Sequence, residues 1–219
     1  MKNYFTSTVG RKQLVAVGGL GLALFLFTHM AANMLILFSP KAYNIYSHKL
    51  ITNPLIYIAE LGLLGLLFLH MMLAMALVFR NWGARKKAYA IRPKGKAAAT
   101  LSSRTMWFQG SVILLFLISH LLTFKFGEYY SVTYDGVEMR DLHRLVVEVF
   151  QNPAYVVGYM FCLVLLYGHL KHGVSSLFQS FGLSNVHEKV ISAVGWIYGL
   201  VVVGGFISQP IYVYFFYKG

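Results

Sequence analysis

Five stretches of apolar residues, each long enough to cross a lipid bilayer as a helix, constrain the fold of this sequence more than any other feature. They lie approximately at 13–38, 54–79, 105–126, 154–178 and 190–217. A helix needs about 20 apolar residues to span the hydrocarbon core. The chain of 219 residues is also 58% hydrophobic and only 12% charged. The sequence therefore predicts an all-α fold, a single membrane domain over residues 1–219 with five transmembrane helices.

The charged residues between these stretches predict the orientation of the helices. The segment 80–104 carries eight Lys and Arg residues and no Asp or Glu. Because loops rich in Lys and Arg stay in the cytoplasm, we expect this loop and the N-terminus inside and the C-terminus outside. The net charge of +12 is thus a topology signal, and we expect no nucleic acid partner. In the outer loop, Leu142, Leu145, Val146 and Val149 recur at helical spacing, which predicts a short amphipathic helix on the outer surface.

Each of the first four predicted spans carries one histidine not far from its middle, namely His29, His70, His120 and His169. His29 and His120 lie about four residues beyond the middle of outward-running helices, hence about 6 Å toward the outside at a rise of 1.5 Å per residue. His70 and His169 lie beyond the middle of inward-running helices and so fall toward the cytoplasm. The four histidines therefore form two layers of two, each drawn from two different helices.

Two such layers match the ligand requirement of two b-type haems, because a haem iron has two axial positions that neutral imidazole can fill. The single cysteine, Cys162, is in no sequence for covalent haem attachment. Six-coordinate iron has no open site, so electron transfer is the expected activity. Glycines near these positions would let a flat macrocycle or a neighbouring helix approach closely; they are Gly18, Gly19, Gly21, Gly62, Gly65, Gly110, Gly158 and Gly173.

Other interpretations of the histidines stay open. A histidine inside a membrane can simply donate a hydrogen bond to a neighbouring helix. His172 competes with His169 as a ligand, although it lies nearer the cytoplasmic end. The remaining histidines, His48, His143 and His187, are in segments expected to be loops, where they would be solvated or interfacial.

The chain resembles the single-polypeptide, five-helix, dihaem cytochrome b membrane anchor of succinate:quinone oxidoreductases and quinol:fumarate reductases. The resemblance covers nearly the whole chain. It depends on the four histidines, on Ser103-Arg104-Thr105-Met106 before Gly110, and on His169-Leu170-Lys171-His172-Gly173 leading to Ser176, Phe178 and Gly182.

This resemblance implies roles and partners. His70 and His169 would ligate the haem proximal to the cytoplasm, and His29 and His120 the distal haem. The partners would be a cytoplasmic flavoprotein with FAD and an iron–sulfur subunit, with menaquinone as the quinone, in a bacterial cytoplasmic membrane. The carboxylate chemistry would belong to those partners, and quinone chemistry would occur in or next to this chain. Where some relatives carry a glutamate two residues before the fourth ligand, this chain has Tyr167, so a compensating proton path is in doubt.

Further site residues are suggested by depth and chemistry. Arg11, Gln13, Ser103 and Arg104 lie near the cytoplasmic surface and offer donors for the proximal haem propionates. Glu60 is the only carboxylate inside a predicted span, in its outer half, where it could take a quinol proton or be a structural, hydrogen-bonded glutamate. Candidates beside it for a quinone site are Tyr57, Tyr43, Tyr46 and His48.

Two rival functions are also compatible with the sequence. A dihaem cytochrome b that anchors a hydrogenase, formate dehydrogenase or nitrate reductase would have similar histidines. A proton-coupled transporter could use histidines as relays, but such proteins generally need several buried carboxylates, and the predicted spans contain only Glu60. The basic loop could dock the iron–sulfur subunit or only contact anionic lipid. A homodimer is compatible with the apolar helix faces.

Overall fold

The computed structural model describes residues 7–84, 101–183 and 188–217. Five of the helices in these segments are long and apolar enough to cross a membrane. They are α1 (Thr8–Asn33), α3 (Leu55–Ala84), α4 (Leu101–His120), α6 (Pro153–Ser180) and α7 (Glu188–Phe215). The predicted all-α bundle with five candidate spans is thus confirmed. A 3₁₀ turn, Met34–Leu37, extends α1, and a π-helical segment, Leu121–Lys125, extends α4.

The helix starts follow from ordinary capping signals. The Ser7 hydroxyl accepts a hydrogen bond from the Gly10 amide at 3.0 Å and so caps α1. At the start of α6, Asn152 caps the helix and Pro153 occupies the first turn, where a missing backbone donor has no cost. Helices α1 and α4 begin at Thr8 and Leu101, earlier than the expected 13 and 105. A helix can continue past the edge of the apolar stretch from which its span was predicted.

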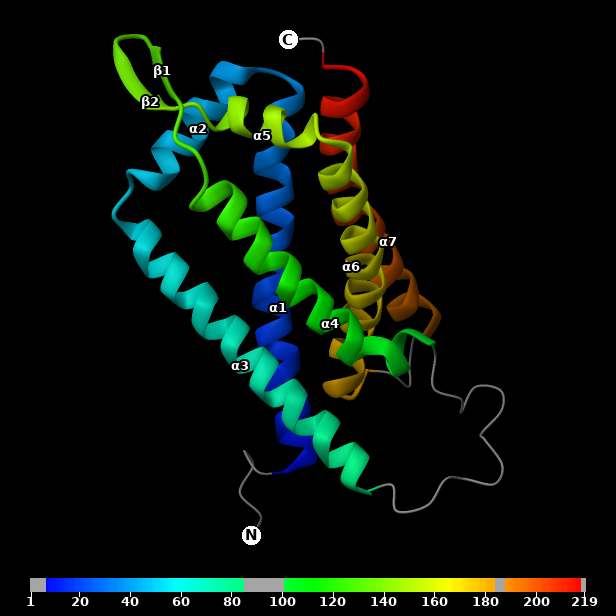
Figure 1. The fold of residues 1–219 in the computed structure, drawn as a ribbon. Helices are drawn as coiled ribbons and strands as arrows, with labels where there is room; N and C mark the ends of the chain where they lie inside the picture. Colours follow the sequence, from blue (N-terminus) through cyan, green and yellow to red (C-terminus); the bar gives the residue numbers. More distant parts are fainter. Residues whose placement is uncertain (1–6, 85–100, 184–187, 218–219) are drawn as a thin grey trace.

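The packing centre of the bundle is the contact between α6 and α7, which run side by side (Figure 1). Buried residues on the two helices form a core of Leu163, Leu166, Leu170, Val202 and Val203. Small residues let the backbones approach closely, since a Cβ on Gly195 would lie only 2.6 Å from the Lys171 carbonyl oxygen. Helix α1 contacts α3, α6 and α7, whereas α3 packs mainly on α1 and lies at the edge of the bundle (Figure 1).

A group of short elements covers one end of the bundle, and we call it the cap. It consists of α2 (Pro40–Ile51), strands β1 (Ser131–Tyr134) and β2 (Val137–Arg140), and α5 (Leu142–Phe150). Helix α7 ends on this side, whereas α1 begins at the opposite end (Figure 1). The expected short amphipathic helix is present as α5, which buries Leu145, Val146 and Phe150. Its inner face joins a second core with Ile36, Tyr43, Val156 and Val213.

Two predictions for the connecting segments are wrong. His48 was expected in a loop but lies on α2, and His143, in the outer loop, lies on α5, the helix predicted there. His143 was also expected to be solvated or interfacial, and it is only 4% exposed. The cause is that α2 and α5 pack across the end of the bundle and create an interior of their own. His187 lies outside the described residues.

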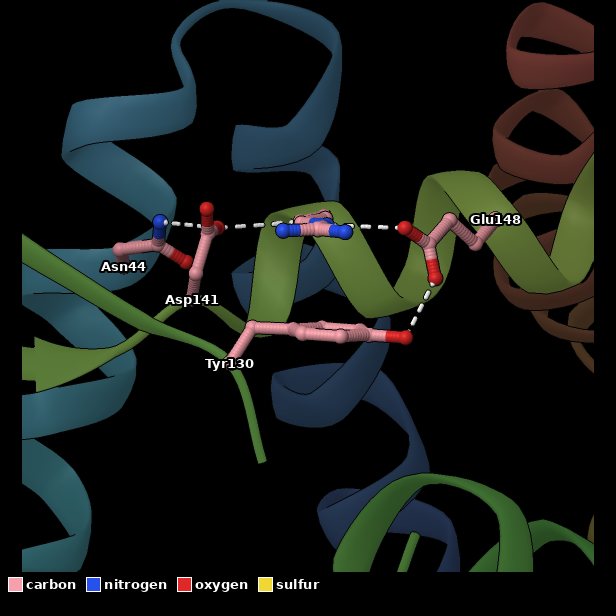
Figure 2. Close-up of polar contacts among 5 residues, drawn as sticks. Asn44, Tyr130, Asp141 and Glu148 are labelled. Atoms are coloured by element: carbon pink, nitrogen blue, oxygen red, sulfur yellow. Dashed lines mark hydrogen bonds and ion pairs between the residues drawn. The ribbon is translucent and has the colours of Figure 1, made fainter. Parts of the chain in front are cut away.

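Polar side chains connect the elements of the cap (Figure 2). The buried Asn44 of α2 donates to Asp141 Oδ1 at 2.7 Å, and its own carbonyl oxygen accepts from the His143 amide at 2.9 Å. Arg144 lies over the Tyr130 ring, 4.0 Å from its centre, and both side chains donate to the Glu148 carboxylate. This network fixes α2 and the segment preceding the hairpin against α5.

Candidate functional site

The structure brings the four histidines inside the bundle together as two pairs. The rings of His29 on α1 and His120 on α4 have centres 5.9 Å apart and are perpendicular. The rings of His70 on α3 and His169 on α6 have centres 6.4 Å apart with an angle of 69° between their planes. They are the same two pairs that the predicted depths of the histidines in the membrane give.

Both separations fit two imidazoles that share one iron. Two imidazoles that each placed one nitrogen about 2.0 Å from a shared metal would have ring centres about 6 Å apart. Aromatic rings in direct contact have centre-to-centre separations in the same range. The separation alone therefore does not distinguish a metal site from ring packing. The hydrogen bonds of Nδ1, the ring nitrogen that would not bind the metal, are more informative.

The outer nitrogen of His70 is hydrogen-bonded in the manner that is usual for a metal ligand. His70 Nδ1 lies 3.2 Å from the carbonyl oxygen of Val15. A carbonyl can only accept, so Nδ1 carries the proton and Nε2 keeps its lone pair. A histidine that ligates a metal through one nitrogen almost always donates from the other to a carbonyl, carboxylate or water.

The other three histidines differ in their outer contacts. His120 Nδ1 lies 3.2 Å from the hydroxyl of Tyr159 on α6. His29 Nδ1 lies 3.4 Å from the amide nitrogen of Asn33, which donates at 2.9 Å to the His29 carbonyl. His169 Nδ1 is buried and has no hydrogen-bond partner among the described residues. The Tyr159 hydroxyl can therefore accept a hydrogen bond from His120 Nδ1, whereas the Asn33 amide nitrogen can only donate to His29 Nδ1.

Some of the predicted glycines leave space directly beside the histidine rings. A Cβ on Gly19 would lie 3.4 Å from Cε1 of His70, and a Cβ on Gly110 would lie 3.7 Å from Cε1 of His169. Gly18 faces the Cβ of His70, and Gly21 faces Leu66. The other four predicted glycines have nothing within 4 Å of an added Cβ, so the structure assigns them no close packing contact; they are Gly62, Gly65, Gly158 and Gly173.

Each histidine pair is a donor set of two ring nitrogens. In the part of the chain that the structure describes, no three His, Cys, Asp or Glu side chains converge on one point. Each pair offers two neutral nitrogens, which is the number of axial ligands that a haem iron takes from a protein. Cys162 is only half-buried on α6 and lies in neither pair.

The candidate propionate contacts lie at the end of the bundle opposite the cap. Gln13 on α1 donates to the carbonyl oxygen of Ser180 at 3.3 Å and so ties α1 to the end of α6. Arg11 is half-buried, and Arg104 is exposed near the start of α4. The side chain of Ser103 lies outside the described residues.

The candidate quinone residues are divided between two helices. Tyr43 on α2 is buried in the second core, and its hydroxyl donates to Asn33 Oδ1 at 2.8 Å. Tyr46 and His48 lie on the same helix. Tyr46 is 43% exposed, and His48 is half-exposed. Tyr57 on α3 is 66% exposed, and Glu60 one turn later forms an ion pair with Lys125. Tyr43 therefore belongs to the packed interior, whereas Tyr57 and Glu60 lie near the start of α3, on the side of the cap.

Sequence reasoning missed three residues next to the histidines and Glu60. Asn33 could have been found, because it follows His29 by four residues and so lies on the same helix face. Tyr159 and Lys125 have no such local signal, since they meet His120 and Glu60 only through the packing of different helices.

Comparisons with protein-family models, curated proteins and solved structures found no match to this chain. Its function must therefore be inferred from its own residues. Two ring pairs, each spanning two helices and each placed inside an apolar bundle, are the feature with the clearest chemical meaning.

Proposed function

We propose that this chain is a dihaem cytochrome b that anchors a succinate:quinone oxidoreductase or quinol:fumarate reductase in the bacterial cytoplasmic membrane. The observation that carries the proposal is the formation of two histidine pairs, His29 with His120 and His70 with His169, at separations that suit axial ligation of iron. The family that the sequence resembles uses its histidines in the same two pairs.

In this proposal each pair holds one haem, which supplies one-electron transfer when bound. The two sites follow each other along the bundle. Gly110 faces the His169 ring, and His120 comes ten residues later on α4, a rise of about 15 Å. The chain thus offers one site toward the N-terminal end of α1 and one toward the cap.

The proposed orientation has the N-terminus in the cytoplasm and the C-terminus outside, with the iron–sulfur and flavoprotein subunits on the cytoplasmic side. The proximal site, His70 with His169, would exchange electrons with the iron–sulfur subunit. The distal site would exchange them with menaquinone. Because moving one elementary charge across the membrane field involves about 2.3 kcal/mol per 100 mV, a quinone site near the cap would couple the reaction to the membrane potential.

The first test is a haem count on protein purified from membranes in mild detergent. A dithionite-reduced minus oxidised spectrum and a pyridine haemochrome assay should give two b haems per chain. Replacing His29 or His120 by Leu should remove one haem, and replacing His70 or His169 should remove the other. Absence of haem from folded protein made in haem-supplemented cells would overturn the proposal.

The second test identifies the soluble partners. Purification of the tagged chain from its native membrane should recover a flavoprotein and an iron–sulfur protein, and succinate should reduce the haems of that complex. Recovery of hydrogenase, formate dehydrogenase or nitrate reductase subunits would retain the haem sites but replace the proposed reaction.

A further inference from the structure

The hydroxyl of Tyr159 on α6 lies 3.2 Å from Nδ1 of His120 on α4. We propose that Tyr159 is a positioning residue, which accepts a hydrogen bond from His120 and thereby sets the electron affinity of the distal site. The inference rests on the proposed function, since it needs His120 to be an iron ligand.

Aromatic rings from three other elements hold the Tyr159 ring in place. Phe116 of α4 and Phe150 of α5 meet it edge to face, with ring centres at 4.8 and 4.9 Å. Phe124, in the π-helical segment, lies at 6.3 Å with an angle of 81°. Edge-to-face contacts of this kind favour one ring orientation. The hydroxyl is therefore presented to His120 by a rigid surround that includes the cap helix α5.

The direction of the hydrogen bond follows from the role of His120. If Nε2 ligates iron, Nδ1 must carry the proton and donate it, and the Tyr159 oxygen accepts. Such an outer contact raises the basicity of the ligand. A more basic imidazole stabilises oxidised iron more than reduced iron, so the contact lowers the midpoint potential of the distal haem.

The Tyr159 contact is suited to a direct test, because one atom can be removed. The corresponding partner of His70 is the backbone carbonyl of Val15, which no side-chain substitution removes. Substituting Tyr159→Phe deletes the hydroxyl but keeps the ring among Phe116, Phe124 and Phe150. The side-chain packing then stays the same while the hydrogen bond is lost.

The experiment is a redox titration of purified Tyr159→Phe protein, with electron paramagnetic resonance of its low-spin haems. We expect both haems to be present, one midpoint potential to rise and the other to stay unchanged. The haem that shifts should be the one lost in His120→Leu, and its resonance should change as well. The matched control is Tyr198→Phe, which removes a hydroxyl that donates to the Ala23 carbonyl and should shift neither potential.

A second variant covers the case in which Tyr159→Phe does not assemble. Incorporation of 3-fluorotyrosine at position 159 keeps the hydroxyl but weakens it as an acceptor, and should raise the same potential by a smaller amount. Unchanged potentials and spectra, or equal shifts of both haems, would overturn the role of Tyr159 while leaving the haem sites intact. A wild-type chain without haem would instead overturn the proposed function.

Discussion

Glu60 on α3 forms an ion pair with Lys125, the last residue of the π-helical segment that extends α4. The two side chains are 42% and 43% exposed in the isolated chain. Ionisable groups inside a membrane-spanning segment are costly unless they are paired or face a cavity. The pair thus stabilises a carboxylate in the half of α3 nearer the cap, and it also connects two helices that pack mainly on other partners.

The role of Glu60 can be separated from that of the ion pair. If Glu60 takes a proton from quinol, Glu60→Gln should lower quinone-dependent turnover of the complex by at least about 10-fold, because a positioned acid or base contributes about 10²-fold or more. Lys125→Met breaks the same ion pair but keeps the carboxyl group that can take the proton, so turnover should fall clearly less than in Glu60→Gln. The measurement is menaquinol oxidation, with an artificial electron acceptor as control for the soluble subunits. Equal losses in both variants would make the ion pair structural.

The choice between His169 and His172 as ligand gives a second prediction. The His70 ring pairs with His169, while His172 lies almost one turn further toward the end of α6. We therefore expect His169→Ala to lose one haem and His172→Ala to retain two, as measured by pyridine haemochrome. Loss of a haem from His172→Ala together with retention in His169→Ala would reverse the assignment.

The membrane fold could be predicted from the sequence because each span is long, apolar and separated from the next by polar residues. The pairing of histidines could be predicted as well, since depth follows from position along a straight helix. Both arguments use one-dimensional information. Neither requires knowledge of which helix faces lie against each other.

The cap was missed in part although its signals are in the sequence. Asp135 and Gly136 have φ values of 53° and 80°, the two positive values of a type I′ turn, and Asp-Gly between short alternating strands is a strong hairpin signal. Ser39 and Pro40 likewise mark the start of α2. By contrast, the contact of Tyr159 with His120 depends on how α6 packs against α4. No local sequence pattern predicts the packing of two helices.

A third prediction concerns the space beside the proximal pair. A Cβ on Gly110 would be in van der Waals contact with the His169 ring, at 3.7 Å, so the longer side chain of Gly110→Leu competes with that ring for space. We expect loss of the proximal haem and a decrease in stability of about 1–3 kcal/mol, the usual cost of overpacking. Gly158→Leu is the control, because nothing lies within 4 Å of a Cβ there. Haem content and thermal unfolding in detergent measure both effects, and equal behaviour of the two variants would argue against a tight proximal site.

The last prediction is that acid loosens the cap through His143. This side chain is only 4% exposed and lies between the rings of Tyr43 and Tyr217. Its Nε2 is buried and has no hydrogen-bond partner among the described residues. Burial lowers the pKa of His143 below its ordinary value of 6.5, while the neighbouring Asp141 carboxylate acts in the opposite direction.

A lowered pKa means that the opened cap binds a proton more readily than the closed cap. Stability is therefore constant above about pH 6.5 and falls as the pH drops from there toward the pKa of the closed cap. Hydrogen exchange of the α5 amides should accelerate between pH 7 and pH 5, after correction for intrinsic exchange, relative to the amides of α6. His143→Phe should abolish this acceleration, since it retains a buried ring without a titrating nitrogen. His48→Gln, on the half-exposed part of α2, should retain it, and an unchanged pH dependence in His143→Phe would assign the effect to another group.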